Sequence, residues 1–228
     1  MWNIFSNQLI AKGGYKLILT GLVSTLEIAI AGLLIGFVLG AILAFIKVAP
    51  KYKRGIRILS RIADVYIALF RGTPIVVQLL IGYFVIAPLL GGLVNGTAVS
   101  IAVFGLNSGA YMSEMIRGGI LSVDPGQLEA GRALGLTFTQ AMIKIVLPQS
   151  VKNILPSLGN EFISLIKETS VVSFIAVVDL TKAYKTMADA TYEYIVPYLM
   201  LALTYLILVM IVTFIMNGIE RRFKKNER

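Results

Sequence analysis

The side chains of this chain that could do chemistry are polar or charged groups placed at regular intervals inside apolar segments. Between residues 98 and 121, Asn107, Tyr111 and Glu114 recur every three or four positions, so a helix would carry them on one face. Hydroxyl and amide groups there can bind a polar ligand, and a carboxylate can bind a cationic one. The groups on or beside this face are Asn107, Ser108, Tyr111, Glu114, Arg117 and Gly118.

Two further apolar segments carry polar stripes of the same kind. A helix over 154–178 would have one polar side, formed by Ser157, Asn160, Ser164 and Lys167 and flanked by Glu161 and Glu168. A thinner stripe in 17–46 consists of Thr20, Ser24 and Glu27. Ionisable groups inside apolar helices are costly and usually mark a pathway for a polar solute. The sequence therefore indicates three stripes that could line one cavity.

Covalent chemistry has few residues available to it. The chain has no cysteine and no histidine, which excludes disulfides, thiolate chemistry, histidine bases and most transition-metal sites. The remaining carboxylates, lysines, serines and tyrosines form no recognisable catalytic motif. We therefore predict no catalytic residues, no metal site and no enzymatic activity for this chain.

The elements that must position these groups are membrane helices. Of the 228 residues, 57% are hydrophobic and only 14% are charged, against roughly a quarter charged in soluble domains. The net charge of +9 could suggest a nucleic-acid partner. The basic residues, however, cluster beside apolar runs rather than on one exposed face, so we predict a membrane protein that binds no nucleic acid.

The apolar runs predict an all-α integral membrane protein with a single transmembrane domain, 1–228. A helix needs about 20 apolar residues to cross a hydrocarbon core of about 30 Å. Five transmembrane helices are expected at about 17–46, 56–87, 98–121, 154–178 and 194–219. The first run is too long for a signal peptide, so we expect it to be retained. In the second, Pro74 cannot complete the helical ladder and Thr73 can cap a restarted helix, which predicts a kink or break.

Lysine and arginine residues give the expected orientation. Segments 47–57, 122–152 and 221–228 hold five, three and five of them, whereas the opposite side has only Lys12, Lys16, Lys182 and Lys185. The positive-inside rule then places the N-terminus outside and the C-terminus in the cytoplasm. The basic C-terminal tail is typical of a stop signal, with lipid-specific binding as the alternative.

The longest expected cytoplasmic connection, 122–152, has the sequence of two short helices. Asp124 can cap the first, which Gly135 would end. Thr137 begins a capping box for the second, which Pro148 would stop. The second helix has a one-sided apolar face. Such a loop, just outside the membrane, is suited to being gripped by another protein; the alternative is a hairpin that lies on the bilayer surface.

The spacing within this loop resembles a known motif. EAG at 129–131, then Gly135, Ile145, Leu147 and Pro148, is similar to the EAA loop of the membrane subunits of ABC importers, with glycine where the second alanine usually stands. In that family the loop inserts into a cleft of the nucleotide-binding subunit. The resemblance implies that ATPase coupling is done by Glu129, Ala130, Gly131, Gly135, Leu147 and Pro148.

Other segments resemble permeases for polar amino acids, which have the type I importer fold. These are LFRGTP at 69–74, AYMSE at 110–114, RGGI at 117–120, PGQ at 125–127 and IKETS at 166–170. The resemblance implies a bacterial cytoplasmic (inner) membrane protein that works with ABC ATPase subunits, an external substrate-binding protein and a second permease chain, expected to be identical. The chain has no phosphate-binding loop motif, so ATP and Mg are expected on the partner and no cofactor on this chain.

An amino acid needs donors for its carboxylate and acceptors for its ammonium group, and half-helix ends are a recurrent device for both. The expected substrate contacts are Gln78, Asn107, Ser108, Tyr111, Glu114 and Asp189. Two carboxylates, Glu114 and Asp189, favour a basic amino acid such as arginine, lysine or histidine. The alternative is a neutral, glutamine-type substrate, because Glu114 could instead form an ion pair with Arg117, three residues on.

The other intramembrane groups are expected to have gating or structural roles: Arg71, Pro74, Arg117, Glu161, Lys167 and Glu168. Adjacent Lys167 and Glu168 point in different directions on a helix, which favours a gate or a contact with a partner helix over a local break open to water. Two other functions stay open. An ion-coupled secondary transporter would show internal repeats, which are not found, and a scaffold that uses the same loop would differ only in a transport assay.

Overall fold

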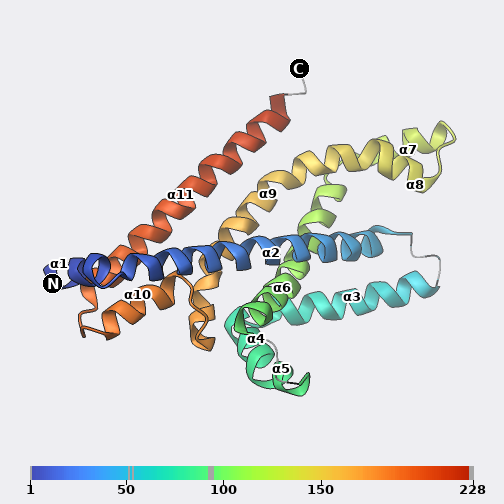
Figure 1. Cartoon of the computed structure of the whole chain (residues 1–228). Coiled ribbons are helices and arrows are strands. Elements are labelled where there is room, and N and C mark those ends of the chain that lie inside the picture. The colour runs from blue at the N-terminus through green and yellow to red at the C-terminus, as the bar shows by residue number, and fades with distance from the viewer. Residues whose placement is uncertain (1, 51, 53, 92–94, 226–228) are drawn as a thin grey trace.

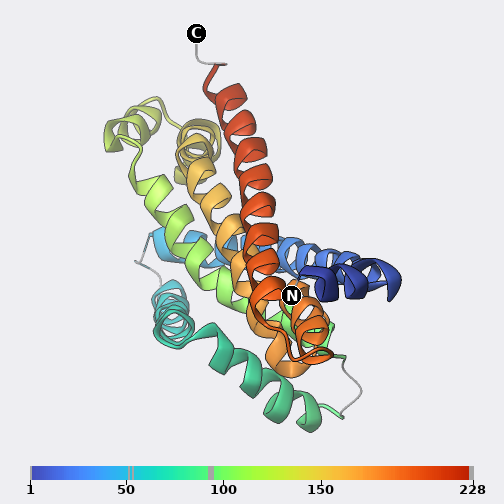
Figure 2. The ribbon, with the colours of Figure 1, turned by 90° about the vertical axis from the view of Figure 1, so that its left-hand side faces the viewer.

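The chain is described by a computed structural model that covers residues 2–50, 52, 54–91 and 95–225. Every regular element in these ranges is a helix, so the expected all-α class is confirmed. Figure 1 shows long helices that cross one another, with the two ends of the chain far apart. Figure 2 shows α9 and α11 running side by side.

The elements follow one another with short connections. In chain order they are α1 (Trp2–Ser6), η1 (Asn7–Ala11), α2 (Gly14–Val48), α3 (Arg54–Gly72), α4 (Ile75–Ile81), η2 (Gly82–Ile86), α5 (Ala87–Leu89), α6 (Gly96–Leu121), α7 (Pro125–Ala133), α8 (Phe138–Ala141), η3 (Met142–Val146), α9 (Leu147–Glu168), η4 (Thr169–Ile175), α10 (Leu180–Asp189) and α11 (Ile195–Lys225).

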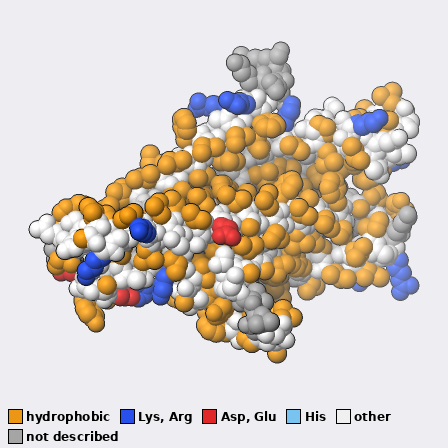
Figure 3. Space-filling model, viewed as in Figure 1, with side chains coloured by type: hydrophobic (Ala, Val, Ile, Leu, Met, Phe, Trp, Pro, Cys, Tyr) orange, Lys and Arg blue, Asp and Glu red, His pale blue; other side chains and the backbone are white. Residues whose placement is uncertain are grey.

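Two described helices are long and apolar enough by themselves to cross a membrane. They are α2 and the Ile195–Phe223 part of α11, each with a mean hydropathy of 2.7 over its most apolar stretch. A third candidate is the pair Arg54–Gly72 and Ile75–Leu89, which is bent by 104° at the break between them. The expected interruption at Thr73 and Pro74 is therefore confirmed. Hydrophobic side chains cover the middle of the molecule, and basic ones gather toward its ends (Figure 3).

Helices α2 and α6 pack closely because both present glycines at their contact, and those of α2 approach the α6 backbone. Gly32, Gly36 and Gly40, one turn apart, face the α6 backbone. A Cβ added to Gly36 would lie 2.7 Å from Ser108 Cβ, and one added to Gly40 would lie 2.5 Å from Met112 Cβ. Small residues at this spacing let two helix backbones approach each other closely. The van der Waals contacts that result stabilise the helix pair, because the hydrophobic effect does not drive helices together in lipid. This glycine seam, defined by the three α2 glycines, fixes α6 in place.

The loop between α6 and α9 begins with the two capped helices that the sequence predicts. The Asp124 carboxylate accepts a hydrogen bond from the Gly126 N–H at 2.8 Å, which starts α7. After α7, Gly135 adopts a φ of 87°, a conformation that suits glycine. Thr137 and Gln140 form the expected capping box at the start of α8.

Pro148 does not stop the second helix, so that expectation is wrong. The chain passes from α8 through the π-helix η3 directly into α9, which continues to Glu168. The wide π turn places Pro148 in the first turn of α9, where a missing N–H is tolerated. Side chains also supply donors to the carbonyls of this turn: Gln149 Nε2 donates to Ile145 O and Ser150 Oγ to Val146 O, both at 2.8 Å.

Candidate functional site

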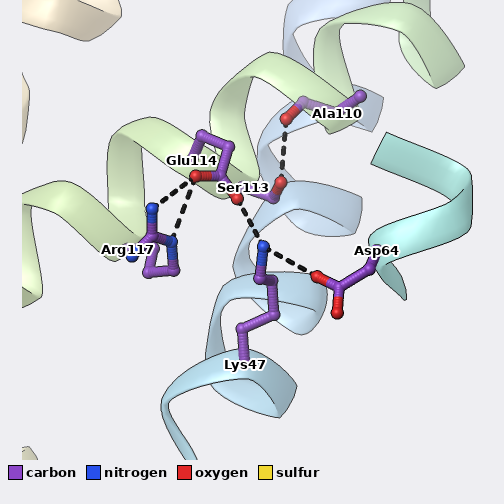
Figure 4. Close-up of polar contacts among 6 residues, drawn as sticks. All are labelled: Lys47, Asp64, Ala110, Ser113, Glu114 and Arg117. Atoms are coloured by element: carbon purple, nitrogen blue, oxygen red, sulfur yellow. Dashed lines mark hydrogen bonds and ion pairs between the residues drawn. The ribbon is translucent and has the colours of Figure 1, made fainter. Parts of the chain in front are cut away.

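Four charged side chains meet where α2, α3 and α6 come together (Figure 4). Lys47 Nζ lies 2.7 Å from Glu114 Oε1 and 3.0 Å from Asp64 Oδ1. Arg117 Nη2 lies 2.6 Å from Glu114 Oε2. The side chains of Lys47 and Glu114 are only 16% and 20% exposed. We call Lys47, Asp64, Glu114 and Arg117 the ionic cluster.

The ionic cluster balances two cations against two carboxylates. Each oxygen of Glu114 already accepts from a cation, so the ion pair with Arg117 that the sequence left open is present. Lys47 and Asp64 were missed by sequence reasoning, which counted Lys47 only as a cytoplasmic flank. A signal did exist, because Asp64 is the only acidic residue in the expected second span and needs a cation nearby.

The amides of Gln78 and Asn107 meet at the break between α3 and α4. Gln78 Nε2 donates to Phe70 O at 2.8 Å, and Asn107 Nδ2 donates to Gln78 Oε1 at 2.9 Å. Thr73 Oγ1 donates to Leu69 O at 2.8 Å, so it caps the end of α3 and not, as expected, the start of α4. Pro74 itself precedes α4 in an extended conformation, and no side chain caps that start.

Ser108 and Tyr111 face different neighbours from those of Asn107. Ser108 Oγ donates to Glu161 Oε1 at 2.8 Å, and both residues are buried between α6 and α9. Tyr111 is half-buried, and the Arg71 guanidinium carbon lies 5.3 Å from its ring centre, within the range of a cation–π contact. The structure thus links the four predicted substrate contacts on α6, which are Asn107, Ser108, Tyr111 and Glu114, to other helices. Their contact with substrate stays a prediction.

Lys167 and Glu168 lie where α9 ends and the 3₁₀ helix η4 begins. Lys167 is exposed and Glu168 is half-buried. Both line an open groove of about 340 Å³, together with Ser164, Ser170 and Val171. The chain continues from α9 directly into η4 with helical backbone angles at Glu168 and Thr169, so both the gating role and the alternative, a local break open to water, stay predictions.

Asp189 does not belong to the same site as Glu114. It lies at the end of α10, where Met187 Cε is 3.0 Å from a Cβ placed on Gly14, at the start of α2. Glu114 contacts Lys47, in the last turn of α2. At 1.5 Å per residue these two places are about 50 Å apart along α2, so one amino acid cannot contact both carboxylates.

Asp189 is instead paired locally on the surface. Lys185 Nζ lies 2.6 Å from Asp189 Oδ2, and both side chains are about half exposed. The hydrogen bond from Lys185 lowers the pKa of Asp189, and the same bond raises the pKa of Lys185. This pairing gives Asp189 a structural partner within its own helix.

Four of the six predicted coupling residues lie on the projecting α7–α8 loop, and coupling itself stays a prediction. Glu129 and Ala130 are exposed, whereas Gly131 is buried against η3, with a Cβ position 2.6 Å from Ile145 Cδ1. Leu147 and Pro148 begin α9. Leu134, which sequence reasoning missed, is 84% exposed beside them. A large apolar side chain so exposed is a mark of an interaction surface when it has polar neighbours, and its position just before Gly135 was a usable signal.

Comparison with known proteins agrees with this architecture. The arginine transport system permease protein ArtQ of Bacillus subtilis (strain 168) is 40% identical over 210 residues, 92% of this chain and 94% of that protein. The putative glutamine transport system permease protein GlnP of Rickettsia bellii (strain RML369-C) is 42% identical over 205 residues, 90% and 92% of the two chains.

Solved structures show the same fold. The crystal structure of an amino acid ABC transporter with histidines matches with a TM-score of 0.84 and 36% identity, over 94% of this chain and 97% of that one. The inward-facing MetNI methionine ABC transporter matches with a TM-score of 0.76 at 18% identity, over 91% and 96%. The family model described as binding-protein-dependent transport system inner membrane component matches residues 36–225. The chain therefore belongs to the family of binding-protein-dependent transport system inner membrane components.

Proposed function

We propose that this chain is the pathway-forming subunit of an ATP-driven importer for a polar amino acid, in a bacterial cytoplasmic membrane. It transports rather than catalyses, and a separate ATPase subunit binds ATP and Mg. The observation that carries the proposal is the α7–α8 loop, which is capped at both helix starts and projects from the end of the molecule with Glu129, Ala130 and Leu134 exposed.

The proposed topology has five spans, with the N-terminus outside and the C-terminus in the cytoplasm. Helices α6 and α9 supply the two spans that apolar composition alone does not reveal. They carry polar groups that bond to each other, as Ser108 does to Glu161, so their low hydropathy reflects helix–helix contact rather than exposure to water. The thirteen basic residues of the three expected cytoplasmic segments support this orientation.

The continuity of α8, η3 and α9 supports a coupling mechanism. Because Pro148 does not interrupt the helix, a displacement of the loop by the ATPase is passed to Glu161 and on to Ser108 of α6. We propose that closure of two ATPase subunits draws the loops of two permease chains together and turns the cavity from inward-facing to outward-facing. An external binding protein delivers the amino acid, and hydrolysis resets the cavity.

The second permease chain is proposed to be identical. Only 6% of the most apolar stretch of α11 is buried within this chain, against 33% for α2. The polar groove at Lys167 and Glu168 is also open. Charged groups beside an apolar surface are unfavourable in lipid, so a second copy that covers this groove accounts for both features.

A basic amino acid is the proposed substrate, and a neutral one is the second candidate. The similarity to an arginine permease and to an amino acid transporter solved with histidines favours the basic class. Two observations favour glutamine: the similarity to glutamine permeases, and the ion pairs that already neutralise Glu114 and Asp189. A ligand cation would have to compete with Lys47 and Arg117 for Glu114.

The deciding experiment is ATP hydrolysis in proteoliposomes that contain this chain, its ATPase and its binding protein. Arginine, lysine, histidine and glutamine are compared, with liposomes lacking this chain as the control. Stimulation by the three cationic amino acids alone supports the basic class, and stimulation by glutamine alone supports the neutral class. No stimulation by any amino acid, together with no uptake of radiolabelled arginine or glutamine, contradicts the importer proposal.

A further inference from the structure

The break between α3 and α4 leaves a backbone carbonyl without its usual donor. In an α-helix the carbonyl of residue 70 accepts from the N–H of residue 74, but that residue is Pro74, which has no N–H. The two helical segments also diverge by 104° here. Phe70 O is thus one of the orphan acceptors of a helix end, and leaving such a group unpaired away from water is unfavourable.

The Gln78 side chain reaches back across the break and supplies the missing donors. Its Nε2 lies 2.8 Å from Phe70 O, 3.0 Å from Thr73 O and 2.8 Å from Thr73 Oγ1. Because an amide nitrogen has only two hydrogens, these acceptors already occupy it. Gln78 therefore connects the first turn of α4 to the last turn of α3.

Helix α6 holds this amide in position. Asn107, which is 4% exposed, donates through Nδ2 to Gln78 Oε1 at 2.9 Å and reaches Phe70 O at 3.4 Å. One turn earlier along α3, the Tyr66 hydroxyl donates to Leu106 O. Two consecutive residues of α6 thus bind the end of α3, in a network that is partly buried on its α6 side, and polar networks whose members are all paired make a structure rigid.

We infer that Gln78 and Asn107 are positioning residues that replace the N–H removed by Pro74 and fix the angle of the broken helix. This assigns them a role different from the substrate contact that their residue types predict. The inference rests on the proposed function at one point, which is that the angle between α3 and α4 shapes the transport pathway. The hydrogen bonds themselves belong to this chain whatever it transports.

The test is a double-mutant cycle between Gln78 and Pro74, read by amide hydrogen exchange of residues 69–79 in the assembled transporter. Gln78→Leu removes the amide and shortens the side chain by one atom, so no hydrogen-bonding group reaches Phe70 O. We expect exchange in this segment to rise about tenfold, the size of effect that loss of one net hydrogen bond produces. Pro74→Ala returns a backbone N–H, so the double variant should regain most of the protection that Gln78→Leu loses.

Gln8→Leu is the matched control, because it makes the same chemical change outside the break and should leave this segment unaffected. Unchanged exchange in Gln78→Leu overturns the inference. So does a purely additive cycle, in which Pro74→Ala rescues nothing. A third contradictory result is a large shift in the amino acid concentration for half-maximal ATPase stimulation without any change in exchange. Failure of every variant and the wild type to transport would count against the proposed function and leave the exchange result intact.

Discussion

Lys47 in the last turn of α2 and Glu114 in the C-terminal half of α6 form a 2.7 Å ion pair, although 67 positions separate them in the chain. The pair lies between Asp64 of α3 and Arg117 (Figure 4). Three helices are thus joined through charges that water reaches only partly. Removing one partner would leave an uncompensated charge, whereas removing both would not.

The first prediction concerns this pair. Glu114→Gln and Lys47→Met should each lower the free energy of unfolding by about 1–3 kcal/mol, less than for a fully buried pair because the groups are partly exposed. The double variant should be more stable than the sum of the two losses implies. Thermal unfolding of the solubilised transporter measures all three. Strict additivity would show that the two side chains do not interact.

The second prediction concerns the glycine seam. Gly36→Leu should prevent normal packing of α2 on α6, because even a Cβ there lies 2.7 Å from Ser108, and overpacking typically costs about 1–3 kcal/mol or more. Gly118→Ala, on α6 with nothing within 4 Å of the new atom, is the matched control and should be neutral or slightly stabilising. Yield of folded protein and its melting temperature distinguish the two. Equal behaviour would contradict the seam.

The third prediction concerns the departure from the EAA pattern. Gly131→Ala places a methyl group 2.6 Å from Ile145 Cδ1, so the Ile145 side chain must turn aside to admit the alanine usual in the pattern, and we expect coupling to weaken modestly. Shortening the facing residue, in Gly131→Ala with Ile145→Val, should restore ATP hydrolysis coupled to uptake. The ratio of amino acid transported to ATP hydrolysed is the measurement. Full coupling in Gly131→Ala alone would refute the prediction.

The fourth prediction concerns the surface offered to the ATPase. Leu134→Asp should weaken binding of the ATPase subunit by about tenfold or more, because a charge would replace an exposed apolar anchor. Thr139→Asp, exposed on the neighbouring α8, adds the same charge and serves as the control. Co-purification and titration with the isolated ATPase compare the two. If Thr139→Asp alone weakened binding, the docking surface would have to lie on α8 instead.

The fifth prediction concerns pH. Asp179 starts α10 by accepting from the N–H groups of Thr181 and Lys182 at 3.0 and 2.8 Å. Burial raises the pKa of Asp179 above its ordinary 3.8, although these N–H groups act in the opposite direction. A raised folded-state pKa means that this carboxyl contributes most stability below pH 3.8 and progressively less as the pH rises through the folded-state pKa.

Asp179→Asn should therefore flatten the pH dependence of stability, because asparagine caps a helix equally well and does not titrate. Asp179→Ala should flatten the pH dependence in the same way and should be less stable than Asp179→Asn by about 1 kcal/mol at every pH, because alanine cannot cap the helix. Melting temperatures between pH 4 and pH 7 measure both effects. If the stability of the wild type instead rises with pH while that of Asp179→Asn stays constant, the pKa of Asp179 is lowered in the folded state, and the prediction is contradicted.

Local signals in the sequence predicted where helices begin and end, whereas contacts between residues far apart in the sequence could not be predicted. The cap at Asp124, the capping box at Thr137 and the break at Pro74 all depend on residues within one or two turns of each other, and all are present. Pro148 was misread because a π turn can absorb a proline, and one-sided hydrophobicity does not reveal such a turn.

The candidate site was harder to predict, because helix periodicity shows which residues share one face of a helix but does not show which other helix packs against that face. Asn107 was assigned to the polar stripe of α6 and Ser108 to its flank, both as contacts of one substrate, yet Asn107 faces Gln78 and Ser108 faces Glu161. Glu114 and Asp189 were paired by charge, yet they lie at opposite ends of α2. Which helix packs beside which is fixed by features such as the glycine seam, whose partner residues lie far along the sequence.

The glycine seam also bears on biosynthesis. Gly36 and Ser108 are 72 positions apart, and at about 5–20 residues per second a ribosome needs roughly 4–14 s to make that stretch. For most of this interval, once Val48 has been made, all of α2 is present, but the groove along its glycines has no α6 to fill it. The membrane insertion machinery or lipid chains must occupy that groove until α6 is made, so a substitution such as Gly36→Leu should reduce the amount of chain that matures, and not only the stability of the chain that does.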